Sequence, residues 1–318
     1  MVCTSAGGRG LAHHGLLHPE SADLPEIVAP LVAPRLARGE SVLGVLPGSG
    51  ADALRAKLPT QAGLHTREPS TLYRYPARVL GHYLTWIADN GAGGAPLTIV
   101  AVPDLSGDDA QRVALWLQID AVTTLALAGC ALTLVCAYPD DPALATRVRG
   151  AHPSMLNGAP KPNPEHLAAE DFLASYPLPP PPELGEPILM RTLACLPQLA
   201  GLRQLVATHA SCAGLPQQRC DDFVLAVNEV ASNAIEHGRP PATVRLWIAP
   251  ASVICEVSDA GRIVDPLAGL LPPNATQRRG RGLWMAYQLC DQLYLWPNPT
   301  TIRLQIDRPD RDPLTVTP

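Results

Sequence analysis

The feature that most constrains the fold is a run of prolines near the middle of the chain. Between Tyr176 and Pro187, prolines stand at positions 177 and 179–182. Proline has no backbone N–H to donate and cannot continue a helix, so this segment cannot belong to a helix or to the middle of a sheet. We therefore predict a stiff linker over residues 176–187, which divides the 318 residues into domains at 11–175 and 188–307.

The two domains show different patterns. The first alternates helices (residues 26–38, 76–89 and 108–128) with strands (41–46, 97–102 and 131–138), which indicates an α/β layered sheet with buried parallel strands. The second groups strands (187–193, 243–248, 253–259 and 301–306) beside helices (197–213, 220–237 and 282–293). We predict an α+β two-layer sandwich for it.

Charge and hydropathy exclude two classes of protein. The chain carries 24 basic and 29 acidic residues, so no basic surface suited to duplex DNA or anionic lipid is expected. The most apolar run, Ala121–Ala137, contains three threonines and a Gly-Cys break, which favours a buried helix followed by a strand over a membrane span. No signal peptide is recognised. We expect a cytoplasmic protein that binds neither nucleic acid directly nor membrane.

Eight cysteines are scattered through the chain without a C-x-x-C pair. Most lie in apolar stretches, where reduced and buried thiols are the expected state. We therefore expect thiols rather than disulfides.

The segment Asp221–Gly238 carries the most informative pattern. It is predicted as a helix that its first residue caps and that its last residue ends in a left-handed turn. Within it, Glu229, Asn233 and His237 recur every four residues and share one stripe of the helix. On spacing alone, the stripe is either a solvated surface or a set of polar groups directed at one ligand.

Two later segments favour a ligand. A predicted strand ends in Asp259, with Gly261 two residues further on, and Gly280, Arg281 and Gly282 open a predicted helix. Glycine before a helix lets backbone N–H groups approach a phosphate, and the helix dipole favours its charge. An aspartate at a strand end can accept a hydrogen bond from an exocyclic amine.

In this order and spacing, E-x-x-x-N-A-x-x-H-G, D-x-G and G-x-G-L resemble the N, G1 and G2 boxes of the GHKL ATPases. The resemblance covers residues 187–307. The domain is short and lacks a phospho-acceptor histidine helix, so it is most similar to the anti-sigma-factor serine/threonine kinases of that superfamily. The resemblance implies the Bergerat ATP-binding fold, ATP and Mg²⁺ as cofactors, and ATP-dependent serine/threonine protein kinase activity.

The resemblance also implies roles for the matching residues. Glu229 would polarise the attacking hydroxyl or water as the catalytic residue, and Asn233 would hold Mg²⁺ against the triphosphate. Asp259 would read the adenine amino group, and Gly261 would let the base pack closely. The residues that would contact the phosphates or close over them are His237, Gly280, Arg281 and Gly282.

Two departures from the family pattern bear on turnover. Ile263 stands where the family usually has the second glycine of D-x-G-x-G, which predicts a stiffer loop. The segment between the boxes, residues 264–279, is short and contains three prolines, which limits a large mobile lid. Nucleotide binding is compatible with both departures, whereas both count against efficient turnover.

Three functions remain open for this domain. The leading one is a serine/threonine kinase whose partners, by resemblance, are a sigma factor and an anti-anti-sigma (STAS-type) protein that carries the acceptor serine. The second is a nucleotide-binding interaction module without catalysis that sequesters its partner. The third is a sensor histidine kinase, which is disfavoured because the nearby His209 falls inside a predicted helix of the same domain.

Residues 11–173 resemble, through shorter motifs, the MEDS sensory domain of regulators that respond to small organic molecules. The matching pieces are the early histidine pair, G-E-S-V at 39–42, L-Y at 72–73, L-V-C-A-Y at 134–138 and H-P at 152–153. The resemblance implies a RecA-like core and a small-molecule ligand. A turn at residues 47–50 stands where a P-loop would, but it lacks G-K-[ST], so no second ATP site is expected.

Two interpretations are open for the polar residues of this domain. Its histidines and Cys136 offer nitrogen and sulfur ligands that suit zinc or iron, yet their wide separation gives no metal-binding spacing. The alternative is a set of core or surface residues without a metal. The candidates for the walls of a small-molecule pocket are His13, His14, Trp116, Cys136, Tyr138 and His152.

The two resemblances together predict a signal-responsive regulator, in which a sensory domain controls an ATP-binding domain through the proline linker. A stiff linker transmits orientation, so ligand binding can change access to the nucleotide site or to the partner surface. The sequence leaves open the sensed molecule and the oligomeric state, a homodimer included.

Overall fold

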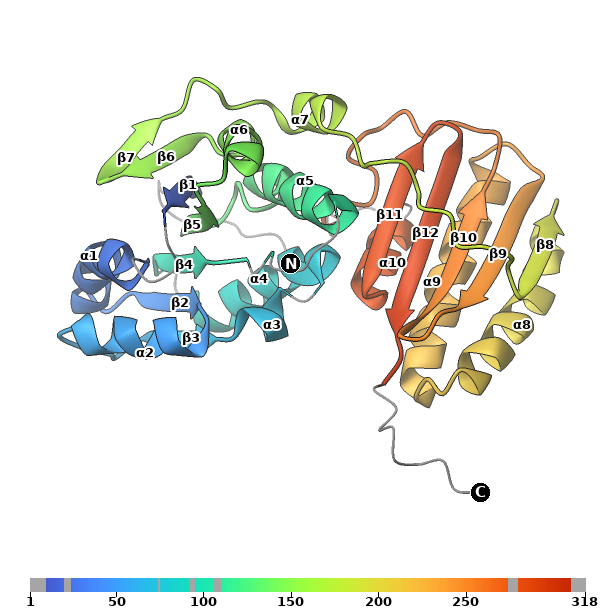
Figure 1. The fold of residues 1–318 in the computed structure, drawn as a ribbon, viewed down its shortest axis with the longest axis horizontal. Helices are drawn as coiled ribbons and strands as arrows, with labels where there is room; N and C mark the ends of the chain where they lie inside the picture. Colours follow the sequence, from blue (N-terminus) through green and yellow to red (C-terminus); the bar gives the residue numbers. More distant parts are fainter. Residues whose placement is uncertain are drawn as a thin grey trace. The chain divides into compact units, whose positions relative to one another are not determined.

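The computed structural model describes residues 10–19, 24–73, 75–91, 95–103, 105, 110–273 and 280–309. It divides the chain into two compact units, residues 1–177 and 178–318, each with a sheet of its own (Figure 1). Within the described ranges, no helix combines the length and the apolar character that crossing a bilayer requires.

The first unit is a layered α/β domain, which confirms the predicted alternation. Its strand order is β3-β2-β4-β5-β1-β6-β7, and neighbouring strands run parallel except β6 and β7. The strands are β1 (Ala12–His18), β2 (Ser41–Val45), β3 (Leu64–Arg67), β4 (Leu97–Ala101), β5 (Leu132–Pro139), β6 (Ser154–Asn157) and β7 (Ala159–Pro162).

Helices cover both faces of this sheet. On one face α1 and α2 pack through a core cluster that includes Leu16, Val100 and Val135. On the other face α5 packs over the side of β1 and β5 that carries His13 and Cys136 (Figure 1). The helices are α1 (Leu24–Ala37), α2 (Gly48–Lys57), α3 (Pro69–Leu72), α4 (Val79–Asn90, after a 3₁₀ turn at Pro76–Arg78), α5 (Ala110–Ala126), α6 (Pro142–Ala151) and α7 (Ala169–Ser175).

Several elements of this unit were not predicted, namely β1, β3, β6, β7, α2, α3, α6 and α7. Strand β1 was not predicted, although it lies between β5 and β6 in the sheet. The turn expected at residues 47–50 is instead the first turn of α2, with Pro47 as its N-cap. Proline is suited to that place because the first backbone N–H groups of a helix have no partner within it.

The second unit is an α+β two-layer sandwich, as predicted. Its antiparallel sheet has the order β11-β12-β10-β9-β8, and the helices α8, α9 and α10 lie on one face of it (Figure 1). The strands are β8 (Leu189–Leu193), β9 (Ala242–Ile248), β10 (Ser252–Ser258), β11 (Gln292–Pro297) and β12 (Thr300–Asp307). The helices are α8 (Leu199–Cys212, after a 3₁₀ turn at Leu196–Gln198), α9 (Gln217–Glu236) and α10 (Gly282–Leu289).

The predicted ends of α9 were wrong. The helix begins at Gln217 with Pro216 as its N-cap, so Asp221 lies inside it rather than capping it. At the other end, Gly238 is not among the glycines with positive φ. The N–H of His237 makes the last regular helical bond, to the carbonyl oxygen of Asn233. The N–H of Gly238 donates to the same oxygen, and the helical pattern ends there. No left-handed residue is then needed there.

Helix α10 is also shorter than predicted. It ends at Leu289, and Cys290 is already in the extended conformation. The buried carboxylate of Asp291 accepts a hydrogen bond from the Arg219 guanidinium at 2.6 Å and one from the backbone N–H of Asp307 at 2.6 Å. These two contacts draw the chain into β11.

The proline-rich segment lies along the second unit over most of its length. We call residues 178–187 the strap, because three of its carbonyl oxygens accept hydrogen bonds from side chains of the sheet. Tyr176 belongs instead to the first unit, where its carbonyl oxygen accepts from Gln118 Nε2 at 3.0 Å. The strap pairs are Trp296 Nε1 with Pro179 O at 2.7 Å, Arg303 with Pro182 O at 3.1 Å, and Trp247 Nε1 with Gly185 O at 3.0 Å.

The expectation of reduced cysteines holds only in part. Cys136, Cys220 and Cys255 are buried thiols. Cys130, by contrast, is disulfide-bonded. Cys130, just before β5, is therefore oxidised, whereas Cys136 within the strand is a free thiol.

Candidate functional site

A cavity of about 580 Å³ opens in the second unit. It lies beside the C-terminal half of α9, over β10 and β12, and along the described part of the segment after Asp259. Val230, Val257 and Ile302 supply apolar lining, and Asn233 supplies a polar group from the helix. A mostly apolar cavity of this volume with a few polar groups is typical of a cofactor or nucleotide site.

Asp259 is the buried carboxylate of this cavity, and it directly follows β10. Its Oδ1 accepts hydrogen bonds from the backbone N–H groups of Arg239 at 2.9 Å and Gly261 at 2.6 Å. Among the described residues, Oδ2 accepts no hydrogen bond. One oxygen therefore fixes the side chain, and the other is left for a ligand that can donate a hydrogen bond.

Glycines make this position of Asp259 possible. A Cβ on Gly238 would lie 2.7 Å from Asp259 Oδ2, and a Cβ on Gly261 would lie 2.5 Å from Oδ1. Across the cavity, Gly280 has a φ of +78°, which side chains rarely adopt. A larger residue at position 238 or 261 would therefore clash with the Asp259 carboxylate. A larger residue at position 280 would be strained by the positive φ.

The predicted polar stripe is divided by the fold. Asn233 and His237 line the cavity, whereas Glu229 does not. A Cβ on Gly282 would lie 2.3 Å from Glu229 Oε2, so this carboxylate packs against the first residue of α10. Of the predicted nucleotide-site residues, the structure brings together Asn233, His237, Asp259 and Gly280 as cavity lining and places Glu229, Gly261, Arg281 and Gly282 outside it.

The loop after Asp259 is held by the β11–β12 hairpin. The N–H of Ile263 donates to Pro297 O at 3.1 Å, and the N–H of Thr300 donates to Gly261 O at 3.1 Å. These contacts agree with the stiffness predicted from the missing second glycine. Residues 274–279 of the same loop lie outside the described residues. Arg262 and Asp265 also line the cavity, and the sequence-based prediction did not include them.

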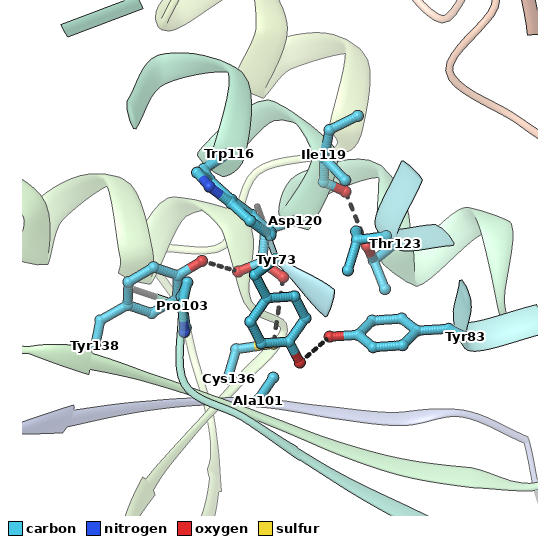
Figure 2. A pocket seen from close by; sticks show the side chains of 11 residues that line it. Tyr73, Tyr83, Ala101, Pro103, Trp116, Ile119, Asp120, Thr123, Cys136 and Tyr138 are labelled. Carbon is cyan, nitrogen blue, oxygen red and sulfur yellow. Dashed lines mark hydrogen bonds between the residues drawn. The ribbon is translucent and has the colours of Figure 1, made fainter. Parts of the chain in front are cut away.

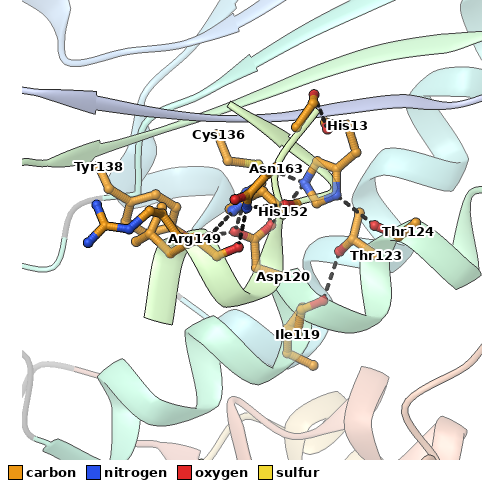
Figure 3. Close-up of polar contacts among 12 residues, drawn as sticks. His13, Ile119, Asp120, Thr123, Thr124, Cys136, Tyr138, Arg149, His152 and Asn163 are labelled. Atoms are coloured by element: carbon orange, nitrogen blue, oxygen red, sulfur yellow. Dashed lines mark hydrogen bonds and ion pairs between the residues drawn. The ribbon is translucent and has the colours of Figure 1, made fainter. Parts of the chain in front are cut away.

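The second site of interest is buried in the first unit. We call it the polar cluster, and it consists of one residue each from β1, α5 and β5 and the residue that ends α6 (Figure 3). In the parallel pairing of β1 and β5, residue 13 is opposite 134 and residue 15 is opposite 136, so both cluster residues of these strands lie on one face. The members of the polar cluster are His13, Asp120, Cys136 and His152.

Asp120 is the centre of the polar cluster (Figures 2 and 3). Its Oδ1 lies 3.3 Å from Cys136 Sγ and 3.4 Å from His13 Nε2. Its Oδ2 lies 3.0 Å from His152 Nε2 and accepts a hydrogen bond from Tyr138 OH at 2.9 Å. The carboxylate is thus contacted by four groups from three other segments of the chain.

The buried groups shift one another's pKa values. Burial alone would raise the pKa of Asp120, but His152 and His13 outweigh it and hold the pKa well below its usual range. Burial alone would lower the pKa of His152, but Asp120 raises it. Burial and the nearby His152 lower the pKa of His13. The structure therefore favours an Asp120–His152 ion pair next to a neutral His13.

A small cavity adjoins the polar cluster (Figure 2). The predicted pocket residues Trp116, Cys136 and Tyr138 line it together with Asp120. Its volume is about 10 Å³, which is room for about one water molecule. In this conformation the cavity therefore accommodates a water-sized species and not an organic molecule.

His14 is separated from the other predicted residues. Its ring hydrogen-bonds Ser154 Oγ, on the opposite side of β1 from His13, and it does not line the small cavity. Burial lowers the pKa of His14 to about 4.

The sequence-based prediction missed Asp120. The sequence feature that indicates it is a carboxylate in a mostly apolar stretch of a helix. In the structure, all of residues 114–123 are buried. A buried charge needs a partner, so such a residue indicates a polar site in the core.

Comparison with known proteins finds a similarity in the second unit. Residues 193–306 match the family model described as "Histidine kinase-like ATPase domain". No curated protein matches the chain significantly. Among solved structures, the chain is similar to the RsbU and RsbW domains of Rv1364c from Mycobacterium tuberculosis, with 23% identity and a TM-score of 0.30. The match covers 45% of this chain and 41% of that one, so it spans about two fifths of that protein's length.

Proposed function

We propose that the second unit, the part that matches a histidine kinase-like ATPase domain, binds ATP with Mg²⁺ in the 580 Å³ cavity and acts as a regulator of the anti-sigma-factor kinase type. The observation that carries the proposal is the arrangement at Asp259. Two backbone N–H groups hold Oδ1, and Oδ2, which lies beside Gly238, has no hydrogen-bond partner among the described residues. An adenine amino group is a donor suited to that oxygen.

The chain offers groups for the rest of the nucleotide. Asn233, which lines the cavity, would hold Mg²⁺, and His237 and Gly280 would contact the phosphates. Arg281 and Gly282 stand at the N-terminus of α10, where backbone N–H groups and the helix dipole favour an anion. Bound ATP would supply the γ-phosphoryl group, and the chemistry would consist of positioning and charge stabilisation.

Two versions of this function differ in the role of Glu229. In the kinase version it acts as general base for a serine of an anti-anti-sigma (STAS-type) partner, while the domain also holds a sigma factor. In the second version the domain is an interaction module that binds nucleotide without transferring phosphate. The packing of Glu229 against Gly282 and the tethered loop at Ile263 favour the second version in this conformation.

For the first unit we propose a sensory role of the MEDS type, with a RecA-like sheet and a small-molecule ligand. The parallel central strands support the RecA-like sheet. The cavity beside Asp120 holds about one water molecule in this conformation, so an organic ligand would require that cavity to widen. We further propose that the protein is cytoplasmic and that this unit controls the nucleotide site. The proposed assembly is a homodimer.

The nucleotide proposal can be tested by replacing one atom. In Asp259→Asn, the side-chain oxygen can still accept from Arg239 and Gly261, while an NH₂ group replaces the second oxygen. Two donors would then face each other when adenine binds. We expect ATP affinity to fall about 10- to 100-fold, as a buried unpaired donor costs about 1–3 kcal/mol. Inosine triphosphate, which has a carbonyl in place of the amine, should bind the variant better than ATP does.

The matched control is Asp221→Asn, an exposed aspartate on α9 that contacts Gln217 and lies away from the cavity. Calorimetry should give it the ATP affinity of the unaltered chain. Equal binding of ATP and inosine triphosphate by both variants would reject the proposal. Incubation with γ-labelled ATP, Mg²⁺ and a serine-bearing STAS protein then separates the versions, because only a kinase transfers label and Glu229→Gln should abolish that transfer.

A further inference from the structure

We infer that the polar cluster of the first unit binds one divalent transition-metal ion, with zinc as the expected occupant. The four residues each offer a ligand atom, and these atoms all lie within 4.8 Å of one another (Figure 3). Two imidazole nitrogens, one thiolate and one carboxylate oxygen form a donor set that zinc takes in proteins. The inference does not depend on the nucleotide proposal, which concerns the other unit.

The distances fit a four-coordinate ion. Zinc bonds of about 2.0–2.3 Å place the corners of a tetrahedron about 3.3–3.6 Å apart. His13 Nε2 lies 3.4 Å from Cys136 Sγ and 3.4 Å from Asp120 Oδ1, and Cys136 Sγ lies 3.3 Å from the same oxygen. Three edges therefore already have the required length. The fourth donor, His152 Nε2, lies within 4.8 Å of the other three donors and would have to move toward them to complete the tetrahedron.

The groups around the polar cluster orient these donors. His152 Nδ1 lies 2.6 Å from Val148 O, which can only accept, so Nδ1 carries a proton and Nε2 faces the cluster. His13 Nδ1 is hydrogen-bonded to Thr124 Oγ1 at 2.9 Å, which leaves its Nε2 to face the cluster as well. Contacts of this kind fix the ligands of protein metal sites.

His152 provides a second, independent indication. Its side chain is fully buried, and Nε2 is not in hydrogen-bond geometry with any described group, although Asp120 Oδ2 is at ion-pair distance. Gly15 leaves space for this ring, because a Cβ there would lie 2.9 Å from His152 Cγ. Asn163 donates to the carbonyl oxygens of Arg149 and His152, each at 2.7 Å, and so fixes the end of α6. The chain thus holds this buried nitrogen in place beside a carboxylate, and the contact does not meet hydrogen-bond geometry.

The charges balance with and without the ion. Without it, Asp120 and His152 lie at ion-pair distance, which makes a neutral pair, and Cys136 Sγ donates to Asp120 Oδ1 and so carries its proton. When M²⁺ binds, the N–H bond at His152 Nε2 and the S–H bond at Cys136 break, the metal bonds form, and two protons pass to the buffer. A divalent ion with one thiolate and one carboxylate is again neutral, as a buried site favours. No oxidant or reductant is required.

Cobalt(II) is a suitable probe because it takes zinc sites and absorbs visible light. The full chain is stripped with a chelator, titrated with cobalt(II) and then with zinc. We expect one cobalt per chain, the visible bands of a tetrahedral site, a thiolate-to-cobalt charge-transfer band in the near ultraviolet, and displacement by zinc. Calorimetry in buffers of different ionisation enthalpy should show release of about two protons per ion.

Variants locate the site. Cys136→Ser should lose the charge-transfer band, whereas Cys195→Ser, at an exposed thiol, should keep it. Tyr138→Phe retains all four ligands and removes only the hydrogen bond to Asp120 Oδ2, so zinc affinity should fall about 10- to 100-fold. His14 follows His13 in β1, and its side chain contacts Ser154 rather than the polar cluster. The His14→Ala variant should therefore bind zinc with unchanged affinity.

The inference is overturned if the full chain shows no charge-transfer band and zinc does not raise its unfolding temperature. It is also overturned if folded Cys136→Ser keeps the band. If that variant does not fold, Tyr138→Phe decides, because unaltered zinc affinity there would place the ion elsewhere.

Discussion

The two units treat a buried aspartate in opposite ways. Asp120 is contacted by four side chains of its own unit, beside a cavity of about 10 Å³. Asp259 is held by backbone N–H groups through one oxygen only, beside a cavity of about 580 Å³. The first arrangement encloses a species no larger than an ion or a water molecule. The second leaves part of a carboxylate's hydrogen-bonding capacity for a much larger molecule.

Glycine has a parallel role in the two sites. Gly15 makes room for an imidazole ring of the protein itself, whereas Gly238 and Gly261 let the backbone approach the carboxylate of Asp259. In the closed site the missing side chain allows the protein's own groups to meet. In the open site it fixes one acceptor at the edge of empty space.

The largest expected effect is on stability, from Asp120→Ala. Removal of this carboxylate leaves His152, Cys136 and Tyr138 buried without their common partner, which should cost the first unit about 3–5 kcal/mol of unfolding free energy. Calorimetric unfolding of the chelator-treated chain measures it, with the exposed Asp89→Ala as control. If the first unit controls the nucleotide site, ATP affinity should change as well, and an unchanged affinity would count against that control.

An intermediate effect is expected at Gly261→Ala. The new methyl group would lie 2.5 Å from Asp259 Oδ1 and 3.0 Å from the backbone nitrogen of Arg239. Overpacking of this kind costs about 1–3 kcal/mol, so nucleotide affinity should fall about 10- to 100-fold in a titration. Gly201→Ala, on α8 with open space around it, should bind nucleotide normally and gain about 0.5–1 kcal/mol of stability. Equal behaviour of the two variants would contradict a requirement for close approach.

The smallest effect concerns the strap. Trp296→Phe removes the N–H that donates to Pro179 O and should weaken attachment of the strap by about 0.5–1.5 kcal/mol. Cleavage by a glutamate-specific protease after Glu183 should then be several-fold faster. Trp284→Phe, on α10, is the matched control, and equal cleavage of both variants would mean that this hydrogen bond does not hold the strap.

The sequence was sufficient for the layers of both units but not for every element. The alternation of helices and strands predicted the parallel sheet because buried strands there are rich in β-branched and aliphatic residues. Strand β1 was missed because His13, His14 and Gly15 interrupt that pattern. Those residues are needed for contacts with α5, β5, β6 and α6, which are distant in the sequence.

The sites show the same division. Asn233, His237, Asp259 and Gly280 could be placed together from motif order, and they line one cavity. The position of Glu229 against Gly282 could not be predicted, because it depends on how α10 packs on α9. Asp120 could not be joined to the histidines by spacing, since the polar cluster forms only when four separate segments meet.

The strap also determines where the second unit can be cut for separate expression. A fragment that starts at Ile188 would expose two indole N–H groups and the Arg303 guanidinium along the sheet, since the carbonyl oxygens that accept from them would be gone. A fragment that starts at Leu178 keeps all three acceptors. The prolines are therefore better kept as part of the folded domain than trimmed away as a spacer.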